Sequence, residues 1–459
     1  MGSRVDFCVM PLLILGFLAL QLDRGNIGNA LTDDFLRDVD ITQNQFNIGQ
    51  QLLSMGIVLL EIPSNLILYR LGPTIWIGTQ VIAWGLVATF QAFQKGLGPY
   101  LATRLLLGLT EAGFIPAGLF TLSRWYKKDE ISKRFAWFFL GNLLAAALSG
   151  IIAYGVLQMR GVGGLAGWQW LFLIEGIFTI LVGIAFLTIF PTSVSKPVSL
   201  VGIRFFSERE SYILSRRILA DDPSKAELKT HVSWQEVKNV LTNWRLLPHV
   251  ALTICGLAPV SSLNSYAPTL VQGFGFGRLE SNLLVSVGYW ILLFVILLWG
   301  WASTRAVCIV GSDYAVYFQC TGMPRSSIHT HLANFRFSPK VVNRCIITSQ
   351  SAILRYVILA ATIAISWPWH PVNGSWLSLN AKTPGERSVT MAIHIMSANC
   401  AGIVGGQLFR SEDKPLYRNG WTVIVCLSAA SVAFALVANV VYYIGNQRKL
   451  RRFGTRFSY

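Results

Sequence analysis

The chain has 459 residues, of which 53% are hydrophobic and 13% are charged, and its mean hydropathy is +0.51. Soluble domains carry about 25% charged residues, so this composition excludes a soluble globular protein and predicts an all-α polytopic membrane protein. The formal net charge of +16 could indicate a nucleic-acid-binding protein, but the basic residues lie in short loops and tails beside apolar segments. That distribution is typical of the positive-inside rule, so we expect a lipid bilayer and no nucleic acid as partner.

Motifs of enzymes and metal sites are missing from the sequence. The seven cysteines are scattered without a CxxC pair, which predicts neither a disulfide framework nor a metal site. No HExxH, GxSxG or phosphate-cradling glycine loop is present, so we expect a protein that is not an enzyme and has no catalytic residues.

Six apolar segments of about 20 residues each, the length needed to cross the hydrocarbon core, fill the first part of the chain. The expected spans are 7–22, 47–69, 74–93, 100–125, 135–159 and 168–190. The first span is predicted to end just before Asp23, and the acid-rich loop from there to Gln45 is predicted to lie outside. The basic clusters at 70 and 124–134 are predicted to be cytoplasmic.

Residues 191–245 interrupt the apolar pattern with many charges and two amphipathic stretches, 207–220 and 233–241. Five further spans are expected at 247–272, 282–301, 354–379, 387–409 and 422–444. Two apolar halves joined by a polar hinge are the layout of a two-lobed transporter. We therefore predict an N-terminal lobe at 1–190, a cytoplasmic loop at 191–245, a C-terminal lobe at 246–445 and a basic cytoplasmic tail at 446–459.

One span of the second lobe, the ninth helix, is in doubt, because segment 305–350 is anomalous. Only 306–320 is apolar there, it is short, and Asp313 interrupts it, while 321–350 contains basic residues and no acid. If 306–320 crosses the membrane, the basic segment lies outside, against the positive-inside rule; if it does not, the later spans invert. We infer a retained intron, a wrong splice choice or a decayed gene, and expect the chain as written to transport poorly.

The apolar stretch 104–134 contains the most informative charges. Arg104 and Glu111 are seven residues apart, so they share one face of a predicted helix about 10 Å apart along its axis, with Gly108 between them. Charges inside the membrane are costly and usually face a cavity, which predicts a functional site, although a structural ion pair between helices is the alternative. Gly108, Gly113 and Gly118 predict close helix approach within one subunit.

Polar side chains inside other spans are weaker candidates. They are Asn142 in the fifth span, Asn264 and Tyr266 in the seventh, and His394 and Asn399 in the eleventh. Each needs a hydrogen-bond partner in an apolar helix, and bonding between helices is as good an explanation as substrate binding. His394 is either a proton relay or simply hydrogen-bonded. We expect Glu175 to be structural and the sequon at Asn373 to carry no glycan.

Four blocks of sequence carry a family resemblance: LDRGNIGNA at 22–30, the block 104–139 with EAGF and SRWY, GWQWLFLIEG at 167–176, and FRSEDKPLY at 409–417. Together they resemble the anion:cation symporter family of the major facilitator superfamily, and within it the fungal allantoate-permease-like branch. The resemblance covers 6–305 and about 354–452. It implies the major facilitator fold of two six-helix lobes, alternating access, and proton-coupled symport of a small organic anion such as allantoate, nicotinate or pantothenate.

The resemblance also implies roles for individual residues. Asp23 and Glu111 take part in proton coupling, while Arg24 and Arg104 tie protonation to the substrate carboxylate. An arginine that leaves a carboxylate for a substrate anion lets that carboxylate take up a proton.

Asn142 and Asn399 lie where relatives contact substrate, and Asn264 and Tyr266 are further substrate-binding candidates. We expect a monomer in the plasma membrane with no metal and no cofactor beyond the proton. A non-transporting, sensing or defective relative and a membrane-embedded enzyme are the alternatives.

Overall fold

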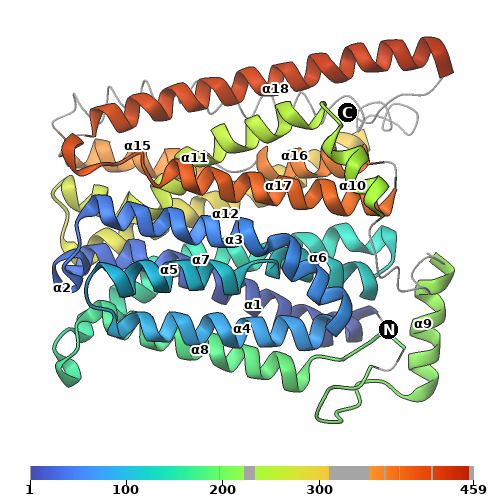
Figure 1. Cartoon of the computed structure of the whole chain (residues 1–459), viewed down its shortest axis with the longest axis horizontal. Coiled ribbons are helices and arrows are strands. Elements are labelled where there is room, and N and C mark those ends of the chain that lie inside the picture. The colour runs from blue at the N-terminus through green and yellow to red at the C-terminus, as the bar shows by residue number, and fades with distance from the viewer. Residues whose placement is uncertain are drawn as a thin grey trace. The chain divides into compact units, whose positions relative to one another are not determined.

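The computed structural model describes residues 2–195, 197–221, 233–309, 351–365, 369–381, 383–414 and 417–453. These residues are almost entirely helical (Figure 1), and the one β-bridge among them pairs Val198 with Arg204. They form two compact units: unit 1 is Met1–His231 with Arg278–Ser286, and unit 2 is Val232–Gly277 with Val287–Tyr459. The all-α fold is confirmed, whereas the predicted lobe and loop boundaries stay predictions.

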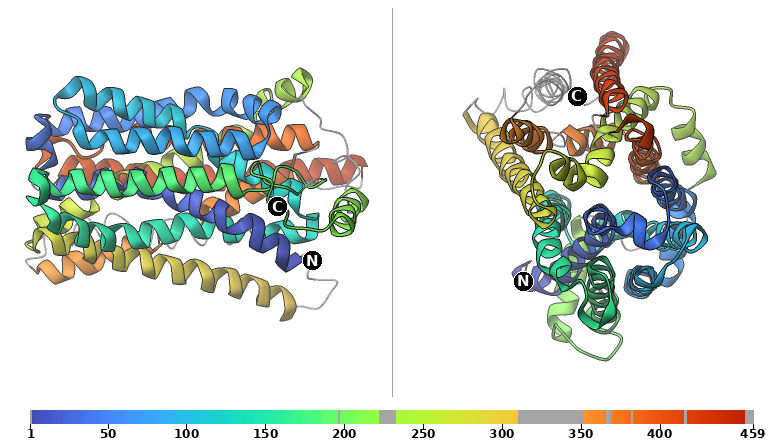
Figure 2. Two further views of the ribbon diagram at one scale, coloured as in Figure 1. Left: turned by 90° about the horizontal axis from the view of Figure 1, so that it is seen from below. Right: turned by 90° about the vertical axis from the view of Figure 1, so that its left-hand side faces the viewer.

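Unit 1 contains the helices of the first half of the chain, and its long helices run alongside one another (Figure 2). They are α1 (Gly2–Ala30), η1 (Leu31–Asp33), α2 (Phe35–Val39), α3 (Gln43–Leu71), α4 (Pro73–Phe90), η2 (Gln91–Phe93), α5 (Leu97–Glu111), α6 (Phe114–Trp125), α7 (Lys128–Val156), η3 (Leu157–Met159), η4 (Val162–Gly164), α8 (Gly167–Ile189) and α9 (Glu208–Asp221). The most extensive packing joins α4 to α8, α1 to α7 and α3 to α5. The last of these pairs positions the candidate site.

The expected end of the first span is wrong. Helix α1 continues to Ala30, so Asp23 and Arg24 lie inside a helix rather than in a loop. The helix continues because Ile27 and Ala30 are buried on the same element and the two charges face partners within the unit. The charges of Asp23 and Arg24 after the apolar segment therefore belong to a polar site in the interior of unit 1 and do not indicate the membrane surface.

The expected fourth span is divided by a kink. Helix α5 ends at Glu111 and α6 starts at Phe114, with Gly113 between them at a φ of +86°. Only glycine adopts this left-handed conformation readily, and a Cβ on Gly113 would also lie 2.3 Å from the Ser64 hydroxyl oxygen. The kink therefore places the Glu111 carboxylate at the last residue of α5, where the backbone changes direction before α6.

Close backbone approach confirms the interpretation of the glycines. A Cβ on Gly108 would lie 2.1 Å from the carbonyl oxygen of Leu53 in α3, and one on Gly118 would lie 2.6 Å from the Phe138 ring in α7. Glycine therefore lets α5 and α6 pack within unit 1 at distances that no other residue permits. In the hydrophobic core of unit 1, the centroids of the Phe17 and Phe138 rings are 4.7 Å apart.

Unit 2 contains the helices of the second half. They are α10 (Trp234–Leu241), α11 (Leu246–Gly273), α12 (Arg278–Ile309, which begins in unit 1), α15 (Ala352–Ile365), α16 (Trp369–Leu379), α17 (Pro384–Gly405), η6 (Ser411–Asp413) and α18 (Arg418–Phe453). Helix α11 packs against α17 and α18, and α10 packs against the start of α17. The two predicted amphipathic stretches are confirmed as α9 and α10.

Ten helices within the described residues are long and apolar enough to cross a membrane. The predicted span 354–379 is found as two shorter helices, α15 and α16, and neither meets that length alone. The described part of the anomalous segment ends at Ile309, the end of α12. Residues 310–350 lie outside the described residues, so the predictions made for them stay predictions.

Candidate functional site

Six ionisable side chains lie in the interior of unit 1. They are Asp23 and Arg24 on α1, Glu61 on α3, Arg104 and Glu111 on α5, and Glu175 on α8. All except Arg24 are at most 3% exposed, and the Arg24 side chain is 21% exposed. Such a group inside an apolar helical lobe is expensive to bury, which indicates a functional site. The structure therefore brings together all four charges predicted from the sequence and adds two carboxyl groups.

Arg24 and Glu111 form the ion pair of this cluster. The Nε atom of Arg24 donates to Oε2 of Glu111 at 2.6 Å, which joins α1 to α5. The second carboxylate oxygen, Oε1, is buried and has no hydrogen-bond partner among the described residues. Glu111 therefore pairs with the arginine on the neighbouring helix, and one of its oxygens stays available for a proton.

Arg104 is buried completely and has no hydrogen-bond partner. None of its three guanidinium nitrogens is bonded to any part of the chain that the structure describes. Its guanidinium carbon lies 5.9 Å from the centroid of the Tyr100 ring, while the Tyr100 hydroxyl donates to the carbonyl oxygen of Phe46. Since an unpaired buried guanidinium is strongly unfavourable, this arrangement suits the binding of an anion by two parallel hydrogen bonds.

Two carboxylates extend the cluster on either side. Asp23 accepts a hydrogen bond from the Thr179 hydroxyl of α8 at 2.9 Å. Glu61 accepts from the backbone N–H of Gly113 at 3.3 Å, at the kink between α5 and α6. Glu61 was not predicted as a site residue, although a lone carboxylate inside the apolar segment 47–69 could have indicated a functional role.

The remaining substrate-binding candidates do not form a second cluster. Asn142 is buried on α7, at 7% exposure. In unit 2, Asn264 accepts from the Tyr289 hydroxyl at 2.6 Å, while the Tyr266 ring packs against Phe409 instead. The Asn399 amide donates to a carbonyl oxygen of its own helix at 3.1 Å. Asn264 thus bonds to a neighbouring helix and Asn399 to its own helix.

The acid-rich loop is folded and neutralised, which sequence analysis missed. Asp33, whose side chain is fully buried, binds Arg160 at 3.0 Å and Arg278 at 2.9 Å through Oδ1, and accepts from the backbone N–H of Trp168 through Oδ2. Burial acts to lower the pKa of Arg160, but its hydrogen bond to Asp33 and the nearby aspartates outweigh burial and raise it. These partners are more than a hundred residues away in sequence, so spacing could not reveal them.

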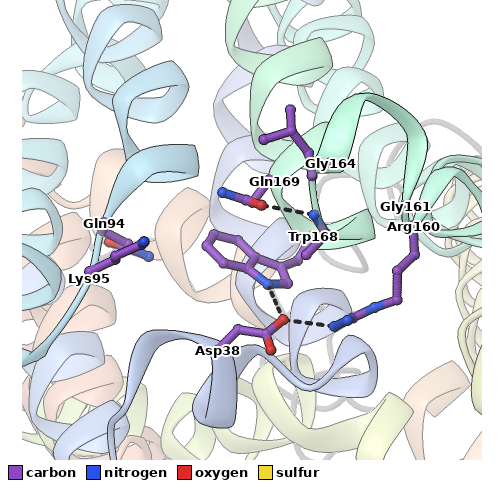
Figure 3. Close-up of a pocket in the computed structure, with 10 residues that line it drawn as sticks. Asp38, Gln94, Lys95, Arg160, Gly161, Gly164, Trp168 and Gln169 are labelled. Atoms are coloured by element: carbon purple, nitrogen blue, oxygen red, sulfur yellow. Dashed lines mark hydrogen bonds and ion pairs between the residues drawn. The ribbon is translucent and has the colours of Figure 1, made fainter.

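A pocket of about 340 Å³ lies beside this loop (Figure 3). Its wall includes Asp38, which accepts from Nη2 of Arg160 at 2.7 Å and from the indole N–H of Trp168 at 2.9 Å. Lys95 and Gln169 line it as well. The pocket is therefore polar and its acidic group is already paired.

Metal binding has no support in the described part of the chain. No three His, Cys, Asp or Glu side chains lie close enough there to hold an ion. Cys8, Cys255, Cys400 and Cys426 are free thiols.

Spanning helices around buried charges define an integral-membrane carrier. The sequence model of the Major Facilitator Superfamily matches residues 13–323, and the chain belongs to that superfamily of transporters. An uncharacterized transporter of Saccharomyces cerevisiae is 28% identical over 458 residues, which cover 98% of this chain and 81% of the yeast protein. The MFS-type transporter cnsO of Penicillium expansum is 27% identical, with coverages of 98% and 84%.

Solved structures confirm the major facilitator fold. A D-xylose-proton symporter is similar with a TM-score of 0.66 and 14% identity, covering 94% of this chain and 97% of the symporter. The nucleoside transporter NupG is similar with a TM-score of 0.61 and 12% identity, covering 94% of this chain and 98% of NupG. The chain is thus a multi-pass membrane protein of a superfamily that carries small molecules across the lipid bilayer.

Proposed function

We propose that this transporter is a proton-coupled symporter that carries a small organic anion, a carboxylate, across the plasma membrane. The observation that carries the proposal is Arg104, a buried guanidinium without a hydrogen-bond partner among the described residues, on the same helix as the ion-paired Glu111. The finer assignment to the anion:cation symporter family, in its allantoate-permease-like branch, is supported by the four sequence blocks. The carrier acts as a monomer, and the proton is its only coupling ion.

The charges in unit 1 suggest how the coupling works. Four buried carboxyl groups face two arginines, so the cluster has an excess of negative charge when every group is ionised. A substrate carboxylate that binds Arg104 and attracts Arg24 weakens the Arg24–Glu111 ion pair. Glu111 then takes up a proton, because an unpaired carboxylate is costly to keep charged in a buried site. Substrate and proton thereby enter together, and neither is stable in the site alone.

Uptake into proteoliposomes with an imposed proton gradient tests the proposal. The probes are labelled allantoate, nicotinate and pantothenate, each at two external pH values. We expect one of them to accumulate only when the outside is acidic. Absence of accumulation for every carboxylate in the panel would contradict the proposed substrate class.

Two variants test the assigned roles. Glu111→Gln mimics the protonated state, so it should lose proton-driven accumulation but keep exchange of internal for external substrate. Arg104→Lys should lose both, because an ammonium cannot reproduce the two parallel hydrogen bonds of a guanidinium. The matched controls Glu208→Gln and Arg216→Lys change exposed residues of α9 and should leave uptake unchanged. Accumulation by Glu111→Gln that still follows pH would remove Glu111 from the coupling step.

A relative that does not complete the transport cycle is the second candidate. It rests on the unusual composition of segment 305–350, most of which lies outside the described residues. Binding of the same labelled carboxylates to the purified protein, measured beside uptake, separates the two candidates, since a defective carrier binds substrate without accumulating it.

A further inference from the structure

Unit 2 contains a cluster of three histidines, two of them buried and one half-buried, that the proposed function does not use. The chain has six histidines, and the cluster consists of His249 on α11, His370 on α16 and His394 on α17. His249 is 0% exposed and His394 is 5% exposed. The rings of His370 and His394 are 4.6 Å apart, centroid to centroid. Each histidine comes from a different helix, so the cluster exists only in the folded unit.

Hydrogen bonds connect His249 with His394 through two neutral side chains, Asn373 and Thr253. Nδ1 of His249 lies 2.6 Å from Oδ1 of Asn373, and the Asn373 amide donates to the Thr253 hydroxyl oxygen at 3.1 Å. The Thr253 hydroxyl donates to the carbonyl oxygen of His249 at 2.8 Å and lies 3.5 Å from Nδ1 of His394. His394, predicted from the sequence to be either a proton relay or simply hydrogen-bonded, therefore belongs to a hydrogen-bond network that involves three helices.

Two ring nitrogens of the three histidines have no hydrogen-bond partner among the residues that the structure describes. Because Asn373 offers its carbonyl oxygen, His249 carries its hydrogen on Nδ1, and its Nε2 is left with a lone pair. That Nε2 atom is buried without a hydrogen-bond partner among the described residues, and so is Nδ1 of His370. Histidines that served only to link helices would be expected to use both nitrogens, since buried polar atoms are normally bonded. The cluster therefore has room for a proton.

The surroundings decide when a proton can be held. Aromatic rings cover His249: Trp376 on α16 at 4.7 Å and Tyr442 on α18 at 5.7 Å. The charged groups nearest along the same helices are Arg245, one turn before His249, and Arg387, two turns before His394. Glu386, next to Arg387, is bonded to Asn239 of α10. No carboxylate forms an ion pair with the three histidines in the part of unit 2 that the structure describes.

An imidazolium in this apolar setting would lack a counterion, so it is unstable unless water enters. A proton from water can therefore enter the lone pair of His249 or His370 only while the cluster is hydrated, and it must leave when the cluster is dry. Alternation between wet and dry states is what a carrier does during its cycle.

We propose that His249, His370 and His394 form a second proton-binding site, in unit 2, which takes up a proton when the lobe is hydrated and releases it when the aromatic cover closes. The site goes beyond the proposed function, which assigns proton coupling to carboxylates of unit 1. It also does not depend on which substrate is carried.

Nitrogen NMR of the full-length protein in lipid nanodiscs tests the site. Selective ¹⁵N labelling of histidine gives six side chains to observe, and the probe is the proton itself, varied from pH 8 to pH 5. The variants His249→Gln, His370→Gln and His394→Gln identify the three cluster signals by their loss. We expect at least one cluster imidazole to change from the neutral to the charged form in this range. Three cluster imidazoles that all stay neutral to pH 5 in the folded protein would overturn the proposal.

Thr253→Val is the matched control, because it breaks the hydrogen-bond chain and leaves all three imidazoles in place. A purely structural network predicts that Thr253→Val destabilises the fold and that no cluster signal titrates in wild type. The proposed site predicts a titration in wild type that persists in Thr253→Val, with a shifted midpoint. Melting of each variant by circular dichroism shows which samples are folded. The experiment is independent of Glu111, so failure here leaves the symport proposal standing.

Discussion

Gly108 is the position at which packing and function of the site are most directly connected. It lies in α5 one turn after Arg104 and three residues before Glu111. A Cβ added there would lie 2.1 Å from the backbone oxygen of Leu53 in α3, whereas ordinary contacts begin at 3.4 Å. Gly108→Ala therefore forces α3 and α5 apart by roughly 1 Å, because a backbone oxygen cannot rotate away as a side chain can.

The cost of this change can be bounded. Overpacking of a closed interface typically costs about 1–3 kcal/mol, while replacing glycine by alanine inside a helix contributes about 1 kcal/mol of stability. We expect a net loss of up to about 2 kcal/mol, measured as a lower midpoint of thermal unfolding in detergent. The folded protein should also lose uptake activity, beyond the loss that unfolding alone would cause. A shift of that size stretches the 2.6 Å hydrogen bond between Arg24 and Glu111 toward the limit of a hydrogen bond.

Gly98 offers a matched control on the same helix. It is exposed, and a Cβ added there would meet no atom within 4 Å. Gly98→Ala should leave stability unchanged or raise it by up to about 1 kcal/mol, without effect on uptake. Equal behaviour of Gly98→Ala and Gly108→Ala would refute the reasoning, because it would show that α3 and α5 are not in contact at Gly108.

Three further predictions concern other parts of the chain. In a cysteine-free background, an impermeant thiol reagent on intact cells should label Asp34→Cys and spare Tyr212→Cys, and the reverse would contradict the predicted topology. Asp33→Asn should lower stability by about 2–3 kcal/mol because it removes the charge that two arginines share, whereas Asp40→Asn, at an exposed turn, should change little. Replacing 310–350 by a loop and an apolar helix of about 20 residues should raise uptake, and equal uptake by the original chain would contradict the splice-error hypothesis.

The spans could be predicted because a bilayer requires long apolar segments, but the ends of those segments could not. Helix α1 was expected to end near Leu22 and continues to Ala30, because the charges after Leu22 were interpreted as the membrane boundary. The structure shows why this fails: in a carrier the same charges belong to the interior. Hydropathy alone cannot distinguish a charge that faces water from one that faces a polar site.

The pairing inside the site was also beyond the sequence. Spacing correctly placed Arg104 and Glu111 in one helix, yet Glu111 pairs with Arg24 of α1 and Arg104 is left unpaired. Which arginine forms the ion pair with Glu111 depends on the packing of α1 against its neighbours and on the kink at Gly113. The spacing of charges along the sequence reveals neither of these. Residues on one helix face were predictable, whereas contacts between helices required the fold.

The two halves of the chain also differ in a way that bears on mechanism. The ion pair of Arg24 with Glu111 lies inside the spans of unit 1, whereas the ion pair of Arg410 with Glu412 in unit 2 is exposed. Unit 2 instead buries imidazoles, amides and hydroxyls. Of these groups, the neutral imidazoles can gain or lose a proton without breaking an ion pair. A carrier that binds an anion against fixed charges in one half can thus respond to pH through neutral imidazoles in the other half. The double substitution Glu111→Gln with His370→Gln separates the two contributions, because each of the two substitutions should remove a different step of the pH dependence of uptake.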